Sequence, residues 1–353
     1  MITTERFACF ILLTVLCTAS ISAGQAPTGA PPPAASTKIY LDVVVSPKSG
    51  PPVADLQQQD FTLLDNKSPQ PITSFQAFTG REAPIKVVLL IDAVNSGTQR
   101  VGYERIQIDK FLRAEGGHLA YPVALAVFTD KGISIAADLS SDGNALSEAL
   151  DKSSIAIRAI GASAGFYGAA ERLQYSLAAL HQLTASLARQ PGRKVVIWVS
   201  PGWPLLSGPR VELTSKQQQQ IFSDVVSFST QLRQAGITLY SVNPVGNGES
   251  MSRASYYKDF LKAVSKPSQV NAGNLGLPVL AIQSGGLAFE LNNDLAAMLQ
   301  QCVSDTAPYY EISFDSAPAD RPDEHHQLEV KLAKPDLIAR MRQGYYAQPL
   351  PKN

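Results

Sequence analysis

Residues 85–92 read IKVVLLID, and this stretch decides the fold. All of its residues up to Ile91 are apolar except Lys86, which is typical of a central parallel strand that helices cover on both faces. Similar apolar runs follow at residues 122–128 (PVALAVF) and 194–200 (KVVIWVS). Between these two runs, residues 166–189 carry leucines at helical spacing, so strands and helices alternate along the chain. The alternation predicts a three-layer, Rossmann-like α/β domain around a mainly parallel sheet.

Further strands and helices are predicted on both sides of these residues. Alternating apolar residues at 38–46 (KIYLDVVVS) and 309–314 (YYEISF) predict β structure on both flanks of the domain. We therefore expect a β segment over residues 38–80, the α/β domain over 84–305 and a C-terminal β extension over 306–348. Within the domain, further strands are expected at 132–137 (antiparallel), 237–242 and 287–291, and helices at 101–113, 216–234 and 293–302.

Composition excludes several classes of protein. The chain has 353 residues, with 30 Lys and Arg against 30 Asp and Glu, so its formal net charge is zero. We therefore expect no nucleic-acid partner, because binding through a basic surface is typical of proteins with an excess of Lys and Arg over Asp and Glu. Apolar residues make up 45% of the chain, which is too many for a protein that is disordered throughout.

The N-terminus has the three parts of a secretory signal peptide. Arg6 gives a positive start, residues 7–16 are apolar, and small residues lead up to Ala23. The pattern predicts a signal peptide over residues 1–23, a Pro- and Ala-rich linker over 24–37, and a secreted or periplasmic protein without a membrane span. The alternative is an uncleaved anchor, although the apolar run is shorter than the roughly 20 residues that cross a bilayer.

Cysteine usage agrees with a fold that needs no disulfide. Cleavage would remove Cys9 and Cys17 and leave Cys302, which cannot form an internal bridge alone. Cys302 follows apolar residues at helical spacing and is expected to be a small buried hydrophobic residue.

Several stretches of the chain together resemble a known family. The stretches are VADLQQQDFTLLDN (53–66), VVLLIDAVNS (87–96), VVIWVSPG (195–202), SGGLAFELNNDL (284–295), YYEISFD (309–315) and ARMRQGYYA (339–347). Their order and spacing are similar to those of the von Willebrand factor type A-related domains of many secreted bacterial proteins, over nearly all of the mature chain. The resemblance implies a metal-ion-dependent adhesion site at one edge of the sheet, where hydroxyl and carboxylate oxygens hold a divalent cation.

Carried onto this sequence, the adhesion site is degenerate. Asp92 takes the first position and Ser96 that of the second serine, but Val94 replaces the first serine and offers no oxygen. Ser163 stands in for the family's threonine, and Pro201 occupies the place of its last aspartate. We therefore expect no cofactor, with Mg²⁺ or Mn²⁺ held by Asp92, Ser96 and Ser163 as the alternative. Without a cation, Asp92 would cap the loop that follows its strand.

A second motif points to a different chemistry. Residues 161–165 (GASAG) satisfy the G-x-S-x-G pattern of a nucleophile elbow, with Ser163 as the nucleophile. The pattern is short, the preceding residues form a poor strand, and His325 and His326 lie beside a polar loop where they are expected to be solvated. A serine hydrolase is therefore an alternative, and a non-enzymatic protein is the main hypothesis.

The main hypothesis is an exported interaction or scaffolding module whose partner is another protein. Its recognition surface would be the loops at residues 92–99, 161–168 and 201–208, where strands of such a sheet end. The last loop carries Trp203, Leu205 and Leu206, and an exposed aromatic residue is typical of an interface anchor. Alternatively, Trp203 caps the sheet from inside.

Overall fold

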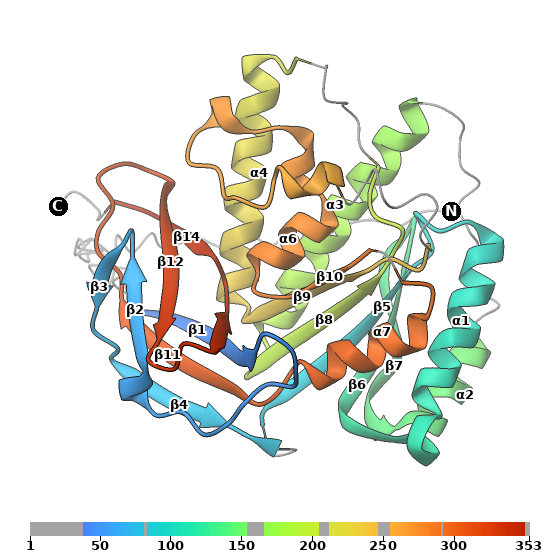
Figure 1. Cartoon of the computed structure of the whole chain (residues 1–353). Helices are drawn as coiled ribbons and strands as arrows, with labels where there is room; N and C mark the ends of the chain where they lie inside the picture. Colours follow the sequence, from blue (N-terminus) through green and yellow to red (C-terminus); the bar gives the residue numbers. More distant parts are fainter. Residues whose placement is uncertain are drawn as a thin grey trace, which may run out of the picture. The chain divides into compact units, whose positions relative to one another are not determined.

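The central sheet is built as the sequence predicts. This computed structural model describes residues 38–80, 83–153, 166–204, 212–245, 255–290 and 292–349, without the side chains of Thr98 and Phe166. Six strands form the sheet in the order β10-β9-β8-β5-β6-β7, and all neighbours are parallel except β6 and β7 (Figure 1). The strands are β5 (Ile85–Asp92), β6 (His118–Thr129), β7 (Gly132–Asp142), β8 (Arg193–Val199), β9 (Ile237–Val242) and β10 (Ala288–Phe289).

Helices cover both faces of this sheet, so the three-layer α/β fold is confirmed. Along β5, Val87 and Leu89 pack on one face, whereas Val88 and Leu90 pack on the other, because successive strand residues point to opposite sides. The first face is covered by α1 (Thr98–Leu112), α2 (Gly143–Ser153) and α7 (Leu295–Ser304). The second face is covered by α3 (Phe166–Ala188), α4 (Ser215–Gln234) and α6 (Leu277–Gln283).

The two flanking β segments combine into a β sandwich. Strand β1 (Lys38–Pro47) pairs antiparallel with β11 (Tyr309–Asp315), and β2 (Phe61–Asp65) pairs with β12 (Glu324–Leu332). The two four-stranded sheets have the orders β13-β1-β11-β4 and β14-β12-β2-β3, and apolar residues of both form one core. The remaining strands are β3 (Ser68–Gln70), β4 (Ser74–Phe78), β13 (Leu337–Arg340) and β14 (Gly344–Ala347).

Buried charges connect the sandwich to the α/β layers. The Arg193 guanidinium, at the start of β8, lies 3.4 Å from Asp42 Oδ2 and 4.5 Å from the centre of the Tyr309 ring, and it donates to the Thr306 carbonyl. Arg340 and the Tyr240 hydroxyl both donate to Asp305. Burial raises the pKa of Asp42, and the nearby arginines oppose that rise. These contacts fasten both flanks to the central sheet within one compact unit, residues 37–353.

Some elements differ from the sequence-based prediction. Helices α2 and α6 and strand β3 were not predicted, and β10 spans only two residues. Short 3₁₀ helices also occur at Gln58–Asp60, Ala114–Gly117, Pro267–Gln269 and Ala272–Leu275. The expected signal peptide and linker lie outside the described residues. Within the described part, no helix has the length and apolar character needed to cross a bilayer.

Candidate functional site

The strand order places a candidate site at the carboxyl ends of β5 and β8. These two strands are neighbours, yet the chain extends from β5 toward β7 on one side and from β8 toward β10 on the other. In doubly wound sheets, ligands bind in the crevice where the order reverses in this way. Asp92 ends β5 and Ser200 follows β8, so both side chains lie at the reversal. We call this region the rim.

Asp92 is fully buried at the rim and is surrounded by protein donors. Its Oδ1 accepts hydrogen bonds from the backbone amides of Val94 (3.0 Å) and Asn95 (2.8 Å). Its Oδ2 accepts from Asn95 Nδ2 (2.9 Å), Ser200 Oγ (2.7 Å) and Trp198 Nε1 (3.3 Å). The geometry is that of a carboxylate capping the loop after its strand, the alternative weighed from the sequence. Burial raises the pKa of Asp92, and the hydrogen bonds from Asn95, Ser200 and Trp198 oppose the rise.

A second buried carboxyl group, Glu104, lies close to the first loop. Ser96 Oγ donates to Glu104 Oε1 at 2.9 Å, and both side chains are buried. Desolvation raises the pKa of Glu104 to about 8, the Ser96 hydrogen bond lowers it, and the charge of Asp92 raises it further. Glu104 therefore carries a proton at neutral pH. Glu104 was not predicted as a site residue, although Val101, Glu104 and Ile108 share one face of α1 by their spacing.

The described residues do not fit the cation site that the family resemblance implies. Both oxygens of Asp92 already accept hydrogen bonds from protein groups, and Val94 is packed into the hydrophobic core. Pro201 supplies no carboxylate, and Ser163 lies outside the described residues. In the part of the chain that the structure describes, no three His, Cys, Asp or Glu side chains are grouped as metal ligands. Two buried oxygens beside the first loop, Asn95 Oδ1 and Glu104 Oε2, have no hydrogen-bond partner in that part of the chain.

Trp203 is not exposed, so the expectation of an exposed aromatic anchor is wrong. Its side chain is only 1% exposed and packs edge-on against Trp198, with ring centres 5.3 Å apart. Gly202, with φ of 91°, adopts the left-handed conformation that lets the chain turn back toward the core, and its amide donates to Ser200 Oγ. Trp203 thus caps the sheet from inside, while Leu205 and Leu206 lie outside the described residues.

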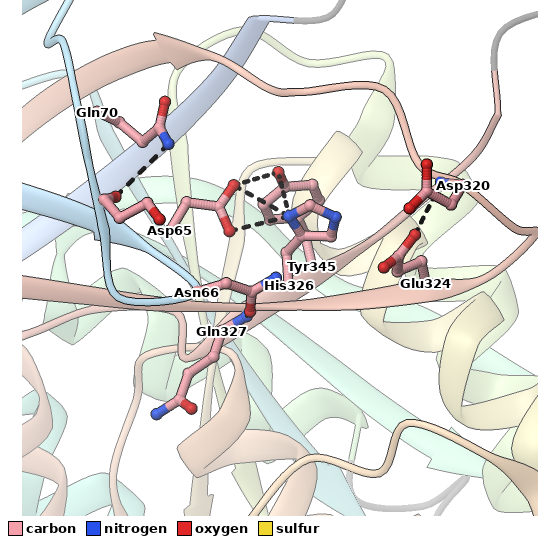
Figure 2. A network of polar contacts seen from close by, with 9 residues as sticks. Asp65, Asn66, Gln70, Asp320, Glu324, His326, Gln327 and Tyr345 are labelled. Carbon is pink, nitrogen blue, oxygen red and sulfur yellow. Dashed lines mark hydrogen bonds and ion pairs between the residues drawn. The ribbon is translucent and has the colours of Figure 1, made fainter.

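The histidine pair is also placed differently from the expectation of two solvated side chains. His326 is 7% exposed, and its Nδ1 lies 2.9 Å from Asp65 Oδ1, while the Tyr345 hydroxyl donates to Asp65 Oδ2 at 2.7 Å (Figure 2). His325 instead meets the Tyr346 ring edge-on, and desolvation lowers its pKa to about 4. The pair belongs to the β sandwich, where Asp65, His326 and Tyr345 join β2, β12 and β14. The proposed nucleophile Ser163 lies outside the described residues.

Cys302 agrees with its prediction. It is fully buried on α7 among the residues that face the central sheet, and burial raises the pKa of its thiol. The thiol is therefore protonated, which leaves the side chain as a small hydrophobic residue.

Comparisons with known proteins give distant structural similarities. No protein-family model matches the sequence, and no curated protein matches it. Proximal thread matrix protein 1 from the mussel byssus is similar over 69% of this chain and 51% of its own, with 13% identity and a TM-score of 0.40. The pilus adhesin SpaC from Lactobacillus rhamnosus GG, in its open conformation, is similar over 88% and 48%, with 12% identity and a TM-score of 0.37. Manganese-loaded TRAP protein from Plasmodium vivax is similar over 80% and 100%, with 10% identity and a TM-score of 0.33. The chain thus spans about half the length of the mussel protein and of SpaC.

Proposed function

We propose that this chain is an exported, non-enzymatic module that binds another protein through the rim, without a cation at Asp92. The observation that carries the proposal is the set of protein donors on Asp92, which leaves neither oxygen available to a metal ion. The reversal of strand order makes the rim the place where this type of sheet binds ligands. Gly97, which ends the loop after β5, and Gln99, in the first turn of α1, are exposed there and available to a partner.

A photo-crosslinking experiment tests whether the rim contacts a partner. A photoreactive amino acid is placed at Gln99, and at the exposed Lys331 of β12 as the control position. After irradiation in the native cell envelope or medium, we expect a discrete protein adduct from position 99 and none from position 331. Equal adduct patterns at the two positions, or no adduct at position 99, would contradict the proposal.

A divalent-cation-dependent adhesion protein is the second candidate. The observation in its favour is that Asn95 Oδ1 and Glu104 Oε2 are buried oxygens without a partner among the described residues. Calorimetric titration with MnCl₂ distinguishes the two candidates. We expect no saturable heat at millimolar Mn²⁺, whereas a saturable heat that the Glu104→Gln variant loses would support the cation site.

Export and the absence of catalysis belong to the same proposal and are tested separately. The mass of the mature protein from its native source reports whether residues 1–23 are removed. A fluorophosphonate probe reports a serine nucleophile, and we expect no labelling of the wild-type chain. Labelling that Ser163→Ala abolishes would replace the proposal with the hydrolase.

A further inference from the structure

A pocket of about 460 Å³ lies beside the edge strand β10, and none of the rim residues described above lines it. Its walls come from three parts of the chain: residues 257–261, helix α6, and β10 together with Glu290 and Asn292. Pockets for small ligands have volumes of about 300–1,000 Å³, so this one is large enough for a small molecule.

The pocket walls are mainly apolar. Leu261 lies on one side, Pro278 and Ile282 come from α6, and Ala288 and Phe289 come from β10. Apolar walls of this kind favour a ligand with a hydrocarbon body, because burying that body removes apolar surface from water.

One unengaged charge lies among the lining residues. Lys258 is exposed, and no hydrogen bond or ion pair involves its ammonium group within the described part of the chain. The other charged lining residue, Glu290, already accepts a hydrogen bond from Asn243 Nδ2 at 3.0 Å. Lys258 is therefore the lining cation that can pair with an anionic head group, while Glu290 is bound to Asn243.

We propose that this pocket binds a small amphipathic carboxylate, with its alkyl chain against Ile282 and Phe289 and its carboxylate at Lys258. This ligand site is separate from the rim and does not depend on the function proposed there. The affinity should depend on the length of the alkyl chain, which contacts the apolar walls, and on the charge of the head group, which pairs with Lys258.

Isothermal titration calorimetry of the mature protein with hexanoate, octanoate and decanoate tests the first part. We expect saturable binding that becomes about fourfold tighter for each added methylene group. Octanol and octylamine provide the matched head groups. Octanoate should bind about two- to fivefold more tightly than octanol, as expected for one exposed charge pair, and more tightly still than octylamine.

Two variants locate the site. Ile282→Trp fills the pocket and should abolish octanoate binding, while Lys258→Met should reduce the affinity for octanoate to that for octanol. Lys262→Met, an exposed lysine of the same segment that does not line the pocket, is the control and should bind as the wild type does. Thermal unfolding shows whether each variant is folded. If Ile282→Trp does not fold, the Lys258→Met variant still tests the proposal. No saturable heat, a preference for octylamine, or unchanged affinity in a folded Ile282→Trp variant would overturn the proposal.

Discussion

Burial changes the protonation of Glu104 at the rim. Its carboxyl group is fully buried, one oxygen accepts from Ser96, and the other has no partner among the described residues. A charged carboxylate in such a place is costly, so the folded chain holds a proton that the unfolded chain would release.

This proton makes the stability of the fold depend on pH. The pKa of Glu104 is about 8 in the folded chain against an ordinary 4.5, so its contribution to stability is complete below pH 4.5 and is lost as the pH rises to about 8. Glu104→Gln keeps the shape without the ionisation. We expect the free energy of unfolding of this variant, relative to the wild type, to rise by about 1.4 kcal/mol per pH unit within that window. Urea unfolding at several pH values measures it, with the exposed Glu329→Gln as a control that shows no such slope.

Trp203 gives a second prediction at this scale. Because its ring is buried against Trp198 rather than exposed, Trp203→Ala should lower the free energy of unfolding by about 3–5 kcal/mol. Trp203→Phe, which keeps part of the ring contact, should lose less. Chemical denaturation checks both, and a loss below about 1 kcal/mol for the alanine variant would contradict the buried position.

Two glycines, one in a helix and one before a strand, differ in the space around them. Gly102 lies on the exposed face of α1, and a Cβ there would meet no atom within 4 Å. Gly286 precedes β10, and a Cβ there would lie 1.9 Å from the Leu239 carbonyl oxygen of β9. The first glycine only weakens its helix, while the second allows the chain to pass close to the sheet.

Alanine substitutions at these two positions should therefore have opposite effects. Gly102→Ala should raise the free energy of unfolding by about 0.5–1 kcal/mol, because alanine costs less entropy in a helix. Gly286→Ala should lower the melting temperature, because the backbone of β9 cannot move away without breaking its pairing with β8. Differential scanning calorimetry of both variants measures this, and a shift of the same sign in both would contradict the argument.

At the scale of the whole chain, the α/β layers depend on strands from both flanks. Arg193 is buried between Asp42, Tyr309 and the Thr306 carbonyl, none of which belongs to residues 84–305. Arg340 likewise comes from outside that range and neutralises Asp305. Removing the flanks would leave these buried charges uncompensated.

We therefore expect the fragment 84–305 not to fold on its own. Thermal melting followed by circular dichroism should show no cooperative transition for this fragment. The longer fragment 38–349 should unfold in a single cooperative transition. The reason is that each uncompensated buried charge costs about 3–5 kcal/mol, a large share of the stability of a domain. A fragment with its own sharp transition would show that the α/β layers are an independent domain.

The covered central sheet could be predicted from the amino-acid sequence alone. Consecutive apolar residues in β5, β6 and β8 predicted strands buried on both faces, and leucines at helical spacing predicted α3, because local periodicity records whether a residue is covered. The burial of Cys302 was likewise predicted from helical spacing. The alternative that Asp92 caps a loop was predicted from its position at the end of a strand.

The partner that covers each residue could not be predicted in this way and follows from the three-dimensional fold. Local sequence patterns do not show which distant residues pack together. Examples are the pairing of β1 with β11, the packing of Trp203 in the core, the burial of Glu104 and the contact of His326 with Asp65. Periodicity in the sequence reflects whether a side chain is buried or exposed. Which residue it contacts depends on how distant segments of the chain pack together. The hydrogen bonds and protonation states of buried polar residues therefore follow from that packing.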